Sequence, residues 1–231
     1  MEYNDVWGRA RLFVHFAMKL IATLGFVTLA LGAQASLFTF DSGAITIPLV
    51  GVASQSPVDY NVTGLDGAIT NVAIYFNGMH HDFPDDVGAV LFSANNTSTV
   101  LFDGPGDNDE TGTSNWDWKF DESVTNVKLS NSGSNPSGFY AAGQDEWLGI
   151  NDFFTDAPAG PYGHSLLDHN GTSLAAATGH WKLYIEDFVG GDGGSIQNVQ
   201  LRITTSPVPE PASLAVLSLG AMALIRPRKQ S

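Results

Sequence analysis

Eight aspartates in turn-rich stretches are the strongest candidates for metal chemistry in this sequence. They form three groups, namely Asp82, Asp85 and Asp86, then Asp103, Asp107 and Asp109, and finally Asp187 and Asp192. Carboxylates bunched in this way repel one another unless solvent or a cation neutralises them, and Ca²⁺ prefers about six to eight oxygen ligands of this kind. No EF-hand spacing is present, so two interpretations stay open: a site with calcium as cofactor, or a solvated acidic rim of Asx turns.

Two short segments suggest a serine protease. The first is the pair His164-Ser165. The second is residues 171–175 (GTSLA), a segment that resembles the Gly-Thr-Ser-Met-Ala sequence around the nucleophile of subtilases. A serine nucleophile needs a histidine base within reach, an aspartate that orients the base, and oxyanion donors. Subtilases take the base and the aspartate from upstream motifs on an α/β scaffold, whereas the upstream stretch here has a β pattern and neither motif. We therefore expect Ser173 to lie in a connection before the strand at Trp181, without catalysis.

The histidines and the remaining carboxylates give weaker candidates. A zinc site could draw on His80, His81, His164, His169 and His180, but nothing in their spacing fixes a set of ligands. Paired carboxylates could hydrolyse a glycosidic bond, but no pair is singled out. The chain contains no cysteine, which excludes a cysteine nucleophile and a thiolate metal site.

A group of aromatic residues lies outside the clear strand patterns. Its members are Trp116, Trp118, Phe139, Tyr140, Trp147, Phe153, Phe154 and Tyr162. Exposed rings could stack on sugars, as in carbohydrate-binding modules, whereas buried rings would fill the core. Burial is the commoner fate of large aromatic side chains, so we expect most of them inside.

Short segments of alternating apolar and polar residues must position these groups. Such alternation occurs at residues 72–76, 89–92, 181–186 and 201–203, and it is typical of strands with one face on a core. Turn-forming residues separate the segments: Asn77-Gly78, residues 103–106, residues 130–138 and residues 190–194. With no convincing internal helix, the pattern predicts an all-β sandwich or jelly roll over residues 36–205.

The charge of this central part excludes one class of partner. Residues 36–205 contain 21 acidic and four basic side chains, the latter being Lys119, Lys128, Lys182 and Arg202, so their net charge is −17. A surface of this kind repels phosphate backbones, which argues against nucleic-acid binding. It suits an extracellular protein or one that collects divalent cations.

The N-terminal residues 1–35 have the pattern of a secretory signal peptide. Lys19 provides a positive charge, residues 20–31 form an apolar run, and Ala33 and Ala35 fit the small-x-small cleavage pattern. We expect a signal helix that signal peptidase cuts after Ala35. Met18 is an alternative start.

The C-terminal residues 206–231 have three parts in a fixed order. The motif Val208, Pro209, Glu210 and Pro211 precedes an apolar run at residues 212–225, and Arg226, Arg228 and Lys229 form a basic tip. The apolar run would extend about 21 Å as a helix, short of the roughly 30 Å of a hydrocarbon core. This ending resembles the PEP-CTERM sorting signal of Gram-negative bacteria, which implies processing by exosortase during transient anchoring in the inner membrane. The basic tip would keep the end cytoplasmic. The alternative is a weak anchor that is never cut.

The central part resembles the P domain (Homo B domain) that follows the catalytic domain in proprotein convertases and some bacterial subtilases. The matching segments are residues 66–72 (DGAITNV), 81–103, 179–187 (GHWKLYIED) and 191–201 (GDGGSIQNVQL). The resemblance implies a jelly-roll β-sandwich of galactose-binding-like topology, with calcium in some relatives.

Together these features predict a non-enzymatic exported protein of the cell surface or extracellular matrix. Signal peptidase and exosortase would be its processing partners, and the tail's resemblance implies a Gram-negative, biofilm-forming bacterium with extracellular polysaccharide as its setting. The alternative is a secreted, calcium-dependent carbohydrate-binding module.

Overall fold

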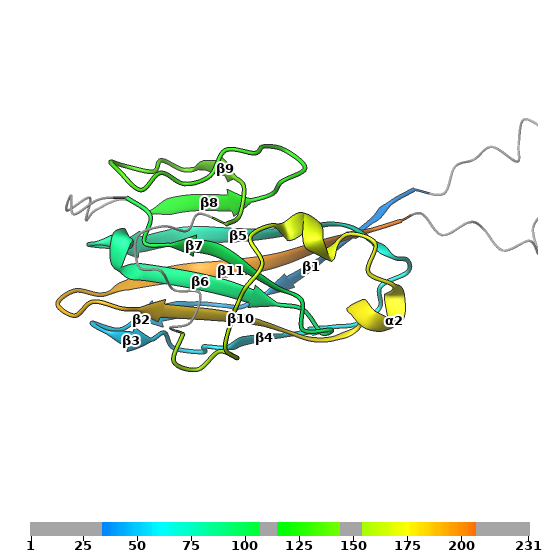
Figure 1. The fold of residues 1–231 in the computed structure, drawn as a ribbon, viewed down its shortest axis with the longest axis horizontal. Coiled ribbons are helices and arrows are strands. Elements are labelled where there is room, and N and C mark those ends of the chain that lie inside the picture. Colours follow the sequence, from blue (N-terminus) through cyan, green and yellow to red (C-terminus); the bar gives the residue numbers. More distant parts are fainter. Residues whose placement is uncertain (1–33, 107–114, 144–153, 207–231) are drawn as a thin grey trace, which may run out of the picture. The chain divides into compact units, whose positions relative to one another are not determined.

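Two mainly antiparallel β-sheets enclose a shared apolar core (Figure 1). The computed structural model describes residues 34–106, 115–143 and 154–206. Apart from Gln34, these residues belong to one compact unit, Ala35–Pro207. The all-β prediction is confirmed. The predicted signal helix and sorting helix, with Ala33 and the Val208, Pro209, Glu210 and Pro211 motif, lie outside the described residues.

The first sheet has the order β1-β11-β5-β8-β9, and β2 also pairs with β11. Its strands are antiparallel apart from the pair of β8 and β9. Their bounds are β1 Ser36–Asp41, β2 Ile45–Ile47, β5 Ile69–His81, β8 Trp116–Phe120, β9 Gly138–Tyr140 and β11 Gly194–Thr205.

The second sheet has the order β3-β10-β6-β7, and β4 also pairs with β10. All of these pairs are antiparallel. Their bounds are β3 Gly51–Val52, β4 Val58–Val62, β6 Val87–Phe92, β7 Ser98–Asp103 and β10 Gly179–Asp187.

Alternation of side chains places one face of each central strand in the core, as predicted. In β5 the side chains of Val72, Ile74 and Phe76 are fully buried, while Tyr75 between them faces outward and is only partly buried. This alternation repeats every two residues, because successive side chains of a pleated strand point to opposite faces of the sheet.

Aromatic rings join the two sheets across the core. Phe102 of β7 lies with its ring centroid 5.3 Å from that of Phe76, 5.6 Å from that of Phe120 and 5.6 Å from that of Trp118. Phe102 belongs to one sheet and its three neighbours to the other. Such rings bury large apolar areas and gain a further contribution from edge and stacked geometry.

Asn77-Gly78 is not a turn, which corrects the prediction from sequence. Both residues lie inside β5, where the register with β8 shifts between Phe76 and Met79. Gly78 has φ 62, a conformation that favours glycine, and its N–H donates to Asp117 Oδ1 at 2.9 Å. The pair therefore forms a β-bulge that lets one long strand continue.

Helices in the described residues are three short segments. They are η2 Pro84–Asp86, η3 Leu166–His169 and α2 Leu174–Ala177. Both η3 and α2 belong to the connection before β10, which was predicted to lack a convincing helix. None of the described helices is long and apolar enough to cross a membrane.

Replacing Phe102 with alanine should lower the free energy of unfolding by about 3–5 kcal/mol, because it removes a ring that both sheets share and leaves a cavity. Urea denaturation followed by tryptophan fluorescence measures this loss. Val124→Ala is the control, since Val124 is 58% exposed and should change stability by less than about 0.5 kcal/mol. Equal effects of the two substitutions would contradict the shared aromatic core.

Candidate functional site

One end of the sandwich gathers most of the aspartates predicted as calcium ligands. The register pairs His81 with Gly194, Val87 with Asp187 and Gly88 with Asp103, so that the ends of β5, β7 and β10 meet the starts of β6 and β11. We call this region the acidic end. Its predicted ligands are Asp82, Asp85, Asp86, Asp103, Asp187 and Asp192; Asp107 and Asp109 lie outside the described residues.

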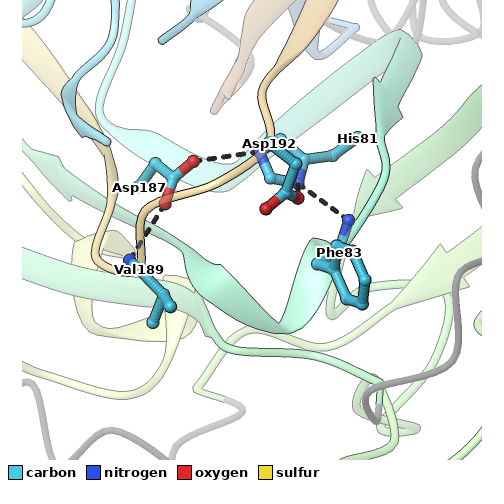
Figure 2. A network of polar contacts seen from close by, with 5 residues as sticks. All are labelled: His81, Phe83, Asp187, Val189 and Asp192. Atoms are coloured by element: carbon cyan, nitrogen blue, oxygen red, sulfur yellow. Dashed lines mark hydrogen bonds and ion pairs between the residues drawn. The ribbon is translucent and has the colours of Figure 1, made fainter. Parts of the chain in front are cut away.

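A buried histidine lies between two of these carboxylates. His81 Nε2 is 3.2 Å from Asp187 Oδ2, and His81 Nδ1 is 3.5 Å from Asp192 Oδ2 (Figure 2). The His81 side chain is fully buried. The second oxygen of Asp187 accepts a hydrogen bond of 3.0 Å from the N–H of Val189. Both oxygens of Asp187 are therefore engaged within the protein.

The backbone selects the tautomer of His81. The N–H of Phe83 donates to His81 Nδ1 at 3.2 Å, so a neutral imidazole carries its proton on Nε2 and donates it to Asp187. A second proton on Nδ1 would give up the hydrogen bond from Phe83 and bring a full positive charge 3.5 Å from Asp192. The same ring can thus serve as a hydrogen-bond donor or as a buried cation.

The charges of the acidic end shift the pKa values of its members upward. Burial lowers the pKa of His81, but the hydrogen bond and charge of Asp187, with the charge of Asp192, outweigh burial and raise it above its ordinary value. Burial, reinforced by the charges of Asp85, Asp192 and Asp187, raises the pKa of Asp86 to about 6. Burial also raises the pKa of Asp192. The acidic end therefore holds more negative charge than one imidazole neutralises.

This arrangement does not form a calcium cage. Among the described residues, no three histidine, cysteine, aspartate or glutamate side chains are grouped so that they could hold a metal ion. Asp187 is already engaged by His81 and Val189, and His81 lies between Asp187 and Asp192. Calcium binding stays a prediction from the sequence.

The histidines proposed as zinc ligands are dispersed. His180, at the start of β10, pairs through Nδ1 with Asp59 Oδ1 at 2.7 Å on the surface. His169 is buried, with Nε2 3.0 Å from Thr99 Oγ1, and burial lowers its pKa to about 4. His81 belongs to the acidic end. No zinc site is assembled within the described residues.

Ser173 lies far from the acidic end. It precedes α2 in the segment that hydrogen-bonds to Ile69, at the start of β5, whereas the acidic end contains the last residues of that strand. Ser173 is exposed and its side chain makes no capping hydrogen bond. Ser165 donates its hydroxyl to Glu122 at 2.5 Å. Within the described part of the chain, neither serine hydrogen-bonds to a histidine.

Most of the candidate aromatic residues are core residues. Trp116, Trp118, Tyr140, Phe154 and Tyr162 are buried, as expected. Four of the eight lie in strands, contrary to the prediction from sequence: β8 is a short alternating segment, WDWKF, and β9 is only three residues long. Phe139 of β9 is the exception to burial, at 42% exposed. Trp147 and Phe153 lie outside the described residues.

Comparisons with known proteins give no assignment. No family model and no curated protein matches the chain. The solved complex of the Aeromonas sobria serine protease with its chaperone (ORF2) has a TM-score of 0.34 and 11% identity, covering 80% of this chain and 29% of that one. The structure of the serine protease of Aeromonas sobria has a TM-score of 0.33 and 11% identity, covering 74% and 27%. This chain spans less than a third of the length of either.

The acidic end should make the protein more stable at mildly acidic pH. The raised pKa of His81 means that its ion pairs contribute fully below about pH 6.5 and are lost as pH rises through the folded-state value. The raised pKa of Asp86 acts in the same direction, because the folded state holds that proton up to about pH 6. We expect the melting temperature to rise as pH falls from about 8 to about 5.

Scanning fluorimetry at constant ionic strength measures this dependence. His81→Gln should flatten the slope above about pH 6.5, whatever its effect on the absolute melting temperature. His180→Gln is the matched control, because His180 is exposed and pairs only with Asp59. A slope unchanged in the His81 variant would contradict the assigned ion pairs.

Calcium binding is testable by the same measurement. Protons on His81 and Asp86 would compete with a cation for the acidic end, so millimolar Ca²⁺ should raise the melting temperature more at about pH 8 than at about pH 5. EDTA should reverse the shift, and Mg²⁺ serves as the control cation. The absence of a shift at both pH values would contradict the calcium prediction.

Proposed function

We propose that the chain is a non-enzymatic exported protein of the cell surface or extracellular matrix. Residues 1–35 direct export, and residues 206–231 act as a PEP-CTERM sorting signal that exosortase processes after transient anchoring in the inner membrane. The setting is the envelope or matrix polysaccharide of a Gram-negative, biofilm-forming bacterium. The supporting observation is where the paired strands begin and end.

The first residue of β1 pairs with the last residue of β11. The register joins Ser36 to Thr205, and these lie one residue after Ala35 and three residues before Val208. Cleavage after Ala35, or within the Pro-Glu-Pro motif, would therefore remove no residue of a described strand. Both proposed processing sites lie just outside the paired strands, so cleavage at either site would leave the sandwich intact.

The carboxylate of Asp66 hydrogen-bonds to the first residue of β1 and to the last residue of β11. Asp66 accepts a hydrogen bond from the Ser36 hydroxyl and another, of 2.5 Å, from the Thr205 hydroxyl. These two hydrogen bonds lower the pKa of Asp66. The N–H of Ser206 also donates to Ala68 O at 2.7 Å. Both strand ends thus have hydrogen-bond partners within the described residues.

We further propose that the sandwich is a jelly roll of the P-domain type with galactose-binding-like topology. The segments that carry the resemblance fall mainly on β5, β6, β7, β10 and β11; all of these except the edge strand β7 lie inside the two sheets. A module of this kind would act by display or binding. The exposure of Ser173 and its lack of a histidine partner among the described residues support a role without catalysis.

The ends of the mature protein test this proposal. Mass spectrometry of the protein recovered from the surface of an exosortase-containing host should give an N-terminus at Ser36 and a C-terminus within residues 208–212. Replacing Pro209 and Pro211 with alanine should leave the full tail on the chain and keep it in the membrane fraction. Pro207→Ala is the matched control, since it lies outside the motif and should be processed normally. An intact tail on the wild-type surface protein would refute the sorting proposal.

A further inference from the structure

A row of side chains crosses the outer face of the first sheet. The register places Asp41, Gln200, Tyr75, Lys119 and Phe139 side by side on β1, β11, β5, β8 and β9. All five are at least partly exposed. Adjacent strands lie about 4.8 Å apart, so the row presents one functional group at each such step. It is therefore an extended, accessible surface.

Two cations lie over aromatic rings in this row. The guanidinium carbon of Arg202 is 4.7 Å from the ring centroid of Tyr75. Lys119 Nζ is 5.8 Å from the centroid of Tyr75 and 5.6 Å from that of Phe139. The two rings are in edge contact, with centroids 6.0 Å apart. We call these four residues the ring–cation face. Cation–π contact holds the charged groups in place without neutralising them.

The positive charges of this face have no anionic partner among the described residues. Lys119 and Arg202 are two of only four basic residues in residues 36–205, which contain 21 acidic ones. Even so, the described ion pairs all involve histidine, and no described carboxylate lies within ion-pair distance of Lys119 or Arg202. As far as the described residues go, these two cations are therefore available to an external anion.

The carboxylates on the same face are engaged elsewhere. Asp41 accepts hydrogen bonds from the amides of Asn198 at 2.7 Å and Gln200 at 2.9 Å. Asp117 accepts from the N–H of Gly78 at 2.9 Å. Both carboxylates thus have neutral donors, and neither forms an ion pair with a described cation.

Asp121, the third carboxylate, lies at the edge of the ring–cation face. It accepts hydrogen bonds from Asn71 at 3.1 Å and from the Ser123 hydroxyl at 2.6 Å, and a longer one of 3.4 Å from the Tyr75 hydroxyl. It is buried and forms no ion pair with a described cation. Its hydrogen bond with the hydroxyl is a polar contact of the Tyr75 side chain beside the cations.

We propose that the ring–cation face binds a carboxylate-bearing polysaccharide, such as a uronic-acid polymer. The inference rests on the proposed function, which places the protein among extracellular polysaccharides. Arg202 and Lys119 would bind sugar carboxylates through charge-assisted hydrogen bonds, and the exposed ring of Phe139 would contact an apolar sugar face. Side-chain amides such as that of Gln200 can bond to hydroxyl groups.

The chemistry favours a polysaccharide over an acidic protein surface. An acidic surface, including that of a second copy of this chain, would need the cations but neither the exposed ring nor the neighbouring amides. The net charge of −17 repels any polyanion at long range, but salt screens this repulsion beyond about 8 Å at physiological ionic strength. Binding therefore depends on the short-range contacts of the face.

Affinity for a defined polymer tests the proposal. The full chain in a mild non-ionic detergent is titrated with alginate and with dextran, a neutral glucan, near physiological salt and with EDTA present. Wild type should bind alginate at least about tenfold more tightly than dextran, because each charge-assisted contact contributes about a factor of ten. Lys119→Gln with Arg202→Gln should weaken alginate binding by about tenfold or more, and Phe139→Ala by a smaller factor.

Lys182→Gln provides the matched control. Lys182 lies on β10 in the other sheet, and its replacement removes one positive charge, half the change of the double variant, from a surface outside the ring–cation face. An equal loss of affinity in this variant would overturn the proposal, as would equal binding of dextran. Melting curves verify that each variant is folded.

Sedimentation tests the competing occupant. Concentration-dependent oligomers that disappear in the Lys119 and Arg202 variant, without alginate binding in wild type, would assign the face to a second copy and overturn the proposal. The mature termini separate this outcome from the proposed function. Correct processing without alginate binding would refute only the ligand, whereas unprocessed termini would refute the sorting proposal irrespective of binding.

Discussion

The antiparallel pairing of β5 with β11 fixes where the acidic end and the ring–cation face lie. At one end the pairing places His81 beside Gly194, which brings the β10–β11 connection and its aspartates to the buried imidazole. At the other end β11 finishes at Thr205, where it meets the start of β1. Between them, Tyr75 of β5 and Arg202 of β11 form the ring–cation face together with Lys119 of β8 and Phe139 of β9. One strand pair thus links the acidic end, the junction of β11 with β1, and the ring–cation face.

The apolar core makes this pairing necessary. A register shift of one residue would move Ile74 and Phe76 to the solvent and bring Tyr75 inside, so burial strongly selects the observed alignment. At the bulge around Gly78 the inward position moves by one residue, from Phe76 to Met79, so the apolar face of β5 stays on the core. Packing of apolar side chains, which has no chemical role of its own, therefore determines which polar groups become neighbours.

The acidic end and the ring–cation face differ in how their charged groups are paired. At the acidic end, several carboxylates are buried together and share one imidazole, so their protonation is coupled to folding. On the outer face, Lys119 and Arg202 lie over rings and no described carboxylate pairs with them. The first arrangement makes stability depend on pH, and the second leaves charge available for binding. Both exist within a domain whose composition indicates only a strong excess of acid.

The sequence alone determined the all-β class, the core faces of the central strands and the acidic character of the domain. Strand alternation and net charge can be obtained this way because each depends on local pattern or composition. Only the tertiary structure decided that His81 contacts Asp187, 106 residues away, and that Lys119 and Arg202 share the ring of Tyr75. It also decided that Asn77-Gly78 is a bulge. Contacts between distant residues follow from register, and register follows from burial summed over the whole core, which no local pattern contains.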